Sequence, residues 1–123
     1  MDHGPSRATV TTYMAAWNEA DAAIRQNLLE QCWADSGVYI DPNVELAGHE
    51  QLSQYIAKVQ ATRPGARIEF VSGIDLHHNV VRFLWRRVHP DGTFGDTSID
   101  FGEIGPDRRL IRIVGFFGAA PAK

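Results

Sequence analysis

The chain has little of several features that mark particular classes of protein. Its 123 residues include one cysteine, so an internal disulfide cannot form, and residence in the cytoplasm is the expectation. No stretch approaches the apolar length that a membrane helix needs. The first six residues carry an acid and a proline where a secretory signal has a basic start and an apolar run. We therefore predict neither export nor a membrane partner.

Surplus positive charge is missing as well. A formal net charge of -3 gives no general attraction for nucleic acid or anionic lipid. The basic pairs, at residues 86–87 and 108–109, lack the flanking aromatics on which a single-strand binder stacks bases. No phosphate loop or dinucleotide fingerprint occurs. We predict no nucleic-acid partner and no cofactor.

Patterns typical of metal or thiol chemistry are also absent. His77 and His78 are neighbours on a predicted strand and should point to opposite faces, so they do not form a two-histidine site. Cys32 lies on an apolar helical stripe without a basic neighbour in sequence, which is typical of inert core. No metal site is predicted.

The residues that are present suit one domain. At 44% hydrophobic and 10% aromatic, the chain has enough apolar side chains for one core. We expect a single soluble domain over 1–123, with its core at about 9–118 and a loose tail at 119–123.

Helical and strand periods follow one another along the chain. Apolar residues repeat at helical spacing in three segments. The first is 7–18. The second is capped by Asp21, includes Ile24 and ends before 35–37, and the third runs from about His49 to the stop at 63–65. A short strand at 38–41 is followed by a loop at 42–48, and four strands of a meander fill 66–118, with turns at 72–73, 90–92 and 105–107. This order predicts an α+β fold.

The strands around residues 80–88 and 110–117 are apolar on both faces. A sheet buried on both sides needs two covers, and three helices supply one. We therefore expect a homodimer through the outer face of the sheet.

Four motifs together resemble one superfamily. They are residues 13–18 followed by Asp21, the break at 33–35, the strand Val38 to Asp41 ending in Pro42, and residues 113–118. In order and spacing they resemble the superfamily of nuclear transport factor two, ketosteroid isomerase and the SnoaL-like polyketide cyclases, over about 9–118. The resemblance implies a cone-shaped half-barrel of about three N-terminal helices packed on a curved, mostly antiparallel sheet, usually dimeric, with an apolar pocket at its open end.

The resemblance to ketosteroid isomerase also implies catalytic residues. Asp41, before Pro42, matches the general base of that enzyme, and Tyr13 with Asp100 matches its oxyanion hole. Proton transfer next to a carbonyl needs one ionised carboxylate and a donor to the enolate oxygen, which a carboxylic acid kept neutral by apolar surroundings can provide. The residues expected to line the substrate pocket are Trp17, Trp33, Tyr39, Tyr55, Ile56, Trp85, Ile113 and Phe117.

Each of these three residues also has an ordinary structural interpretation. Tyr13 lies on the apolar stripe of its helix and would be buried there without catalysis. Asp41 before a proline is a common start to a turn. Asp100 alternates with Asp96 and Ser98, so the strand pattern alone puts it in water and its apolar neighbours in the core. Only the resemblance implies that the side chain of Asp100 points inward.

Two functions remain open. The first is a cofactor-independent isomerase, or polyketide-cyclase-like lyase, that removes a proton next to a carbonyl in a small apolar or carbonyl-containing molecule. The second is a non-catalytic domain that binds a ligand or serves as a dimeric module. An epoxide-hydrolase set is excluded because Ser98, two residues before Asp100, replaces its arginine. The segment from Tyr13 to Asp41 is about one helical turn longer than expected for the isomerase, which favours a ligand smaller than a steroid.

Overall fold

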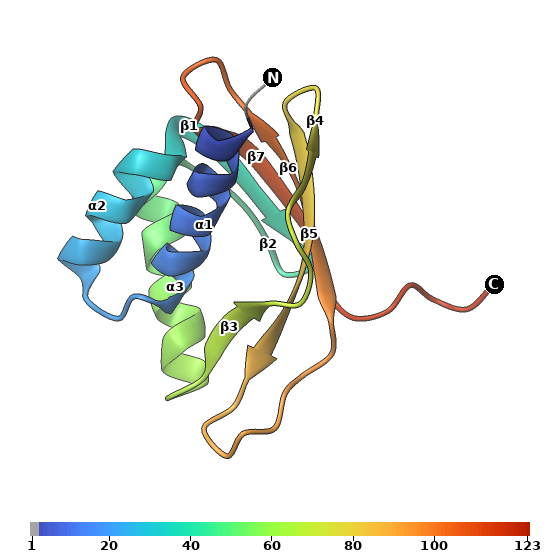
Figure 1. Cartoon of the computed structure of the whole chain (residues 1–123). Helices are drawn as coiled ribbons and strands as arrows, with labels where there is room; N and C mark the ends of the chain where they lie inside the picture. Colours follow the sequence, from blue (N-terminus) through green and yellow to red (C-terminus); the bar gives the residue numbers. More distant parts are fainter. Residues whose placement is uncertain (1–2) are drawn as a thin grey trace.

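Residues 3–123, which a computed structural model describes, form three helices and a seven-stranded sheet (Figure 1). The helices are α1 (Gly4–Asn18), α2 (Ala22–Cys32) and α3 (Gly48–Thr62). The strands are β1 (Trp33–Asp41), β2 (Val44–Ala47), β3 (Arg67–Phe70), β4 (Asp75–His77), β5 (Val80–Val88), β6 (Ser98–Ile104) and β7 (Leu110–Phe116). None of the described helices is long and apolar enough to cross a membrane.

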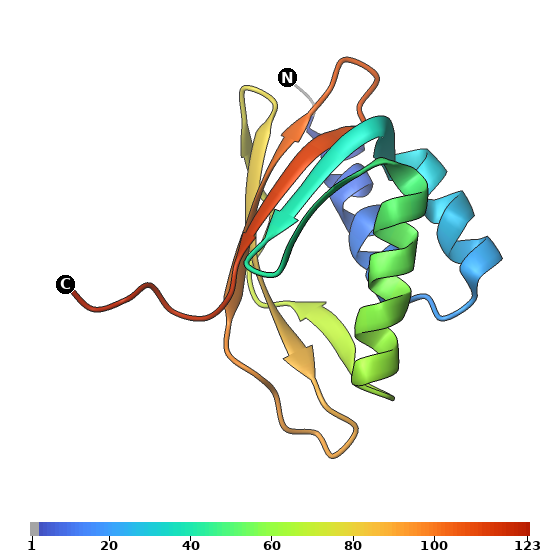
Figure 2. The same ribbon diagram turned by 180° about the vertical axis from the view of Figure 1, so that it is seen from behind.

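The sheet is curved and holds the helices on its inner side. Its strand order is β2-β1-β7-β6-β5-β3, with β4 also paired to β5. β1 and β7 are parallel, and the other described pairs are antiparallel. Seen from behind, all three helices lie on one side of the strands (Figure 2). The predicted fold class, α+β with about three helices on a curved and mostly antiparallel sheet, is confirmed.

The helices follow the sequence signals closely. α1 begins three residues before the predicted start, with Pro5 in its first turn, where the missing N–H costs no helical hydrogen bond. Asp21 caps α2, since its Oδ1 accepts hydrogen bonds from the N–H groups of Ala23 (2.9 Å) and Ile24 (3.0 Å). Ile24, placed on the apolar stripe by its spacing, is nevertheless 49% exposed.

Two strand predictions near the start of the sheet are wrong. β1 begins at Trp33 rather than at Val38, and its pairing with β7 shifts register between these two residues. Residues 42–48, predicted to be a loop, contain β2, which pairs antiparallel with β1 from Val44 to Ala47. A proline ends the first strand, but the chain turns back at once into a hairpin.

The meander has five described strands rather than four. β4 and β5 are joined at His78 and Asn79, which both have positive φ (46° and 62°), as a two-residue type I′ turn requires. The prediction that His77 and His78 point to opposite faces is also wrong, because their Nδ1 atoms lie 3.1 Å apart. The turn brings the His78 ring against the His77 ring.

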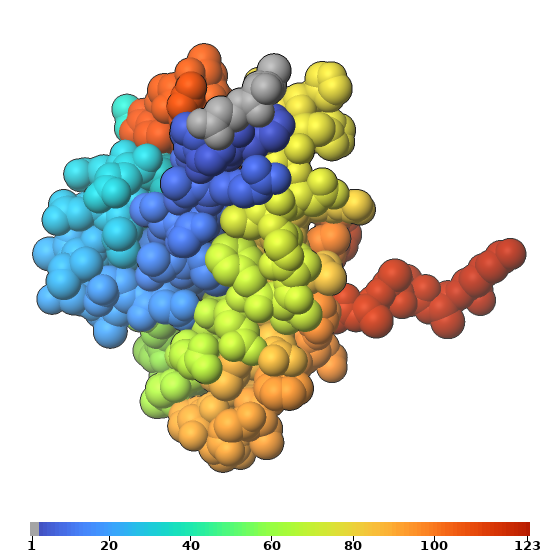
Figure 3. Space-filling view, viewed as in Figure 1, coloured from blue at the N-terminus to red at the C-terminus, as the bar shows by residue number. Residues whose placement is uncertain are grey.

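The core lies between the helices and the inner face of the sheet. Its largest fully buried side chains include Trp33, Tyr13 and Phe83. Residues 117–123 form no helix or strand, and the end of this segment projects from the body of the molecule (Figure 3).

Candidate functional site

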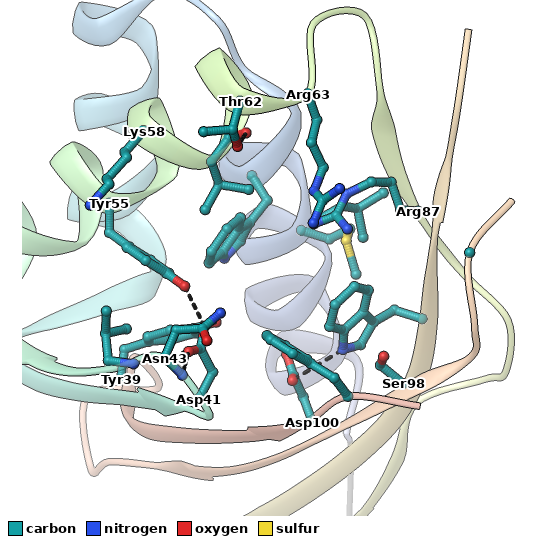
Figure 4. Close-up of a pocket in the computed structure, with 18 of the residues that line it drawn as sticks. Tyr39, Asp41, Asn43, Tyr55, Lys58, Thr62, Arg63, Arg87, Ser98 and Asp100 are labelled. Carbon is teal, nitrogen blue, oxygen red and sulfur yellow. Dashed lines mark hydrogen bonds between the residues drawn. The ribbon is translucent and has the colours of Figure 1, made fainter. Parts of the chain in front are cut away.

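A cavity of about 590 Å³ opens between the inner face of the sheet and helices α1 and α3 (Figure 4). This volume is typical of sites for small molecules. Trp17, Tyr39 and Tyr55 form an aromatic wall, with ring centroids 5.6 to 6.0 Å apart. One side chain comes from each of α1, β1 and α3, so the wall exists only when all three elements are packed.

Asp41 ends β1 on one side of the cavity, and four donors surround its buried carboxylate. Oδ2 accepts from the hydroxyls of Tyr39 (2.7 Å) and Tyr55 (2.8 Å). Oδ1 accepts from the N–H groups of Asn43 (2.8 Å) and Val44 (3.2 Å). Burial raises the pKa of Tyr39, and it raises that of Tyr55 to about 12, so both remain donors at neutral pH. A carboxylate has about four acceptor sites, and here all of them are used.

Asp100 faces the same cavity from β6 and has a different environment. It is 6% exposed, and among the described residues its Oδ1 accepts one side-chain hydrogen bond, from Nε1 of Trp85 at 3.1 Å. Burial raises the pKa of Asp100 to about 7; the indole hydrogen bond acts in the opposite direction, and the charge of Asp41 adds to the rise. At neutral pH this carboxyl group can therefore both hold and release a proton.

Gly115 on β7 separates the two carboxyl groups. It is paired with Asp100, and a Cβ at this position would lie 2.7 Å from Oδ1 of Asp100 and 3.8 Å from Cβ of Asp41. The first distance is shorter than a real Cβ contact allows. The absence of a side chain therefore leaves room for Asp100 on the inner face.

Tyr13 supplies an unused donor at the cavity. Its ring stacks on Trp33 at 5.6 Å, and its hydroxyl is buried without a hydrogen-bond partner among the described residues. The nearby indole of Trp17 favours the charged form of Tyr13 and so acts to lower its pKa, but the two groups do not meet the geometry of a hydrogen bond. Burial, with a smaller effect of the Asp100 charge, raises this pKa well above its usual value, so the phenol stays protonated. An unpaired buried hydroxyl is costly in a folded protein unless a ligand uses it.

Comparison with solved structures identifies the relatives of this chain. A candidate isomerase of the SnoaL-like family from Agrobacterium tumefaciens matches with a TM-score of 0.88 and 31% identity, over 94% of this chain and 98% of that one. The chain belongs to the SnoaL-like family. The resemblance inferred from its four motifs is thereby confirmed, although no family model and no curated protein matches the sequence.

More distant structures share the fold of this SnoaL-like protein. A protein from Methylobium petroleophilum with a cystatin-like fold matches with a TM-score of 0.78 and 15% identity, over 100% of this chain and 82% of that one. A protein from Catenulispora acidiphila with a ketosteroid isomerase-like fold, solved with trimethylamine, matches with a TM-score of 0.70 and 16% identity. The match covers 89% of this chain and 85% of that one. These likenesses concern the fold alone.

The cavity of the SnoaL-like protein contains some of the residues predicted for it and not others. Tyr13, Asp41 and Asp100 all lie at its wall. So do five of the predicted pocket residues: Trp17, Tyr39, Tyr55, Trp85 and Phe117. The other three, Trp33, Ile56 and Ile113, are fully buried in the core and do not reach the cavity. Periodicity assigns a residue to a face, but it does not say whether a second layer covers that residue.

Asp100 is turned inward, contrary to the strand pattern. Ser98 and Asp100 are buried, whereas Phe101 is 44% exposed on the outer face. The inference from alternation is therefore wrong, and the orientation implied by the resemblance is the one observed. The simple pattern was misleading because β6 turns its polar residues inward and its apolar residues outward along this stretch.

Several residues at the cavity were missed, among them Asn43, Lys58, Arg63 and Arg87. The sequence contained a signal for Arg87 as a cavity residue, because it follows Trp85 by two residues on the same face of a predicted strand. Lys58 and Arg63 lie toward the end of α3, where no sequence pattern distinguishes a cavity rim from an ordinary solvated surface.

Proposed function

We propose that this SnoaL-like protein is a cofactor-independent isomerase or cyclase that moves a proton at a carbon next to a carbonyl. The observation that carries the proposal is a buried carboxyl group with a pKa of about 7 at the wall of a cavity with an aromatic wall, together with an unpaired tyrosine hydroxyl at the same cavity. General acid–base groups work best when their pKa lies near the operating pH. Asp100 meets this condition.

The hydrogen bonds favour a different division of roles from that implied by ketosteroid isomerase. Asp41, the expected base, has all its acceptor sites filled by four donors. Asp100 accepts a single side-chain bond from the described residues and has capacity left to take a proton from carbon. We therefore assign proton transfer to Asp100 and an electrostatic role to Asp41, whose charge helps to raise the pKa of Asp100.

Tyr13 is the proposed donor to the enolate oxygen. Its hydroxyl is buried and protonated, and it makes no competing hydrogen bond with the described residues. A donor already in place where negative charge develops stabilises the transition state more than the ground state. The substrate is accordingly a small carbonyl compound that places its oxygen at Tyr13 and its acidic carbon at Asp100.

Binding of para-nitrophenol tests this assignment, because its anion imitates an enolate and is followed by absorbance. We expect wild type to bind the phenolate and Tyr13→Phe to bind it about 10- to 100-fold more weakly, the usual range for losing a hydrogen bond to a charged group. The methyl ether, para-nitroanisole, is the control and should bind both proteins alike. Equal phenolate binding by the two proteins would instead support the alternative, a ligand-binding domain without catalysis.

We also propose that the outer face of the sheet binds a second copy of the chain. Its apolar residues are Val80, Leu84, Ile99, Phe101, Val114 and Phe116, of which the two phenylalanines pack edge to face at 6.5 Å. Arg82, Arg112 and Glu103 place both signs of charge on the same face. A mixed patch of this kind suits a two-fold contact with itself.

Light scattering after size exclusion tests the dimer. Wild type should be dimeric at micromolar concentration, whereas Phe116→Asp should be monomeric, because it puts a carboxylate among the apolar side chains of Ile99 and Phe101 at the contact. Ile24→Asp is the matched control, since Ile24 is 49% exposed on α2, on the opposite side of the sheet. A monomeric wild type would contradict the proposal.

A further inference from the structure

Three cationic side chains line the cavity beyond the residues assigned above. Lys58 and Arg63 extend from the end of α3, and Arg87 extends from β5. Figure 4 shows the guanidinium groups of Arg63 and Arg87 close together on one side of the cavity, with Asp41 on the other side and Asp100 below. The cavity therefore has one positively charged end.

These cations have no acidic partner among the described residues. The neighbouring Arg67 and Arg86 both contact Glu69, with Arg86 at 2.6 Å, and Arg82 pairs with Asp75 at 2.8 Å. No ion pair or side-chain hydrogen bond within residues 3–123 involves Arg63 or Arg87. Asp96 also lines the cavity mouth, yet it pairs with neither arginine. Arg67, Arg82 and Arg86 on the outer face are thus each paired with a carboxylate, whereas Arg63 and Arg87 at the cavity are not.

The arrangement is unfavourable without an anion. Arg87 is half-buried, whereas Arg63 is exposed, and the pKa of Arg87 is lowered by burial and then by the charge of Arg63. A like charge beside a partly desolvated guanidinium disfavours its charged form. A carboxylate between them would relieve the repulsion, because each planar guanidinium matches the two oxygens of a carboxylate.

We propose that the ligand of this cavity is a carbonyl compound carrying a carboxylate, which Arg63 and Arg87 bind while the carbonyl end lies at Tyr13 and Asp100. The inference rests on the proposed function and narrows its substrate class to keto acids and related enolisable carboxylates. Lys58, exposed on α3, adds positive potential to the lining of the cavity. Uncharged ligands of the same shape bind more weakly because they leave the two arginines unpaired.

Phenylpropanoate and its neutral amide, phenylpropanamide, are the probes, and their binding is measured by calorimetry. In wild type, the carboxylate should bind at least about tenfold more tightly than the amide. Arg87→Gln and Arg63→Gln should each raise the Kd of the carboxylate about tenfold or more and leave that of the amide within about twofold, since losing one charged hydrogen-bonded partner has an effect of this size. Arg7→Gln, at an exposed arginine of α1 that does not line the cavity, is the matched control and should change neither Kd.

The outcomes separate this inference from the proposed function. Equal binding of carboxylate and amide by wild type, or no binding of either, overturns the anion site. Unchanged carboxylate binding by both pocket variants overturns it as well, and retained amide binding shows that their cavities are intact. Tyr13→Phe should weaken para-nitrophenolate but not phenylpropanoate. If the arginine effects appear and the Tyr13 effect does not, the anion site stands and the proton-transfer function fails.

Discussion

Replacing Asp100 with asparagine should stabilise the protein at neutral and alkaline pH. Burial raises the pKa of Asp100 from 3.8 to about 7. Below about pH 4 the carboxyl group is protonated in both the folded and the unfolded chain, and it carries no penalty. As the pH rises, the unfolded chain loses this proton first, so the free energy of unfolding of wild type falls until the folded group also ionises near pH 7.

The expected size of the effect is large. A shift of about 3 pH units, from 3.8 to about 7, corresponds to roughly 4 kcal/mol at about 1.4 kcal/mol per unit. The asparagine side chain of the variant would stay neutral throughout, and its carbonyl oxygen would still accept the bond from Trp85. The free energy of unfolding of the variant should therefore rise relative to that of wild type between about pH 4 and pH 7. Above that range the difference between the two proteins should stay constant.

Urea unfolding from pH 4 to pH 9, at one fixed protein concentration, measures this difference. Asp96→Asn is the matched control, because it removes an exposed carboxylate at the mouth of the same cavity. Parallel curves for wild type and Asp100→Asn would show that Asp100 ionises freely in the folded protein. The proposed acid–base role would then lose its basis.

The fold was predictable where local signals and tertiary packing agree. The helical stripes, the Asp21 cap and the stop at Arg63 gave all three helices within a few residues. β2 was missed because its four residues are too short to establish a period after Pro42. β4 was missed because its turn at His78 and Asn79 contains no glycine, although both residues adopt the conformation that glycine favours.

The candidate site was only partly predictable, for a related reason. Alternation correctly put Tyr39 and Asp41 on one face of β1, and the structure joins them by a hydrogen bond of 2.7 Å. The same argument failed for Asp100, because β6 places the polar Ser98 and Asp100 on its inner face and the apolar Phe101 on its outer face, the reverse of the usual contrast. The filling of the Asp41 acceptor sites depends on Tyr55, fourteen residues away on another element. Such a contact has no local signature.

Proton exchange at carbon should depend far more on Asp100 than on Asp41. With cyclohexanone and phenylpyruvate as probes in deuterated water, the loss of the α-proton signal in NMR gives the enzymatic rate above the buffer rate. Asp100→Asn should lower that rate by about 10²- to 10⁴-fold, which is the usual contribution of a general acid–base group. The amide introduced by this substitution cannot take the proton, so the pH dependence should disappear as well.

Asp41→Asn distinguishes this assignment from the one implied by ketosteroid isomerase. If Asp41 acts through its charge, the variant should lose at most about tenfold in rate, the effect of roughly one pKa unit of electrostatic stabilisation. Its pH–rate midpoint should move to lower pH, because the Asp41 charge is one cause of the raised pKa of Asp100. If Asp41 is the base, the order reverses: Asp41→Asn loses nearly all activity, and Asp100→Asn keeps much of it, because the introduced amide still donates to the enolate oxygen. The more damaging substitution thus identifies the carboxyl group that exchanges the proton.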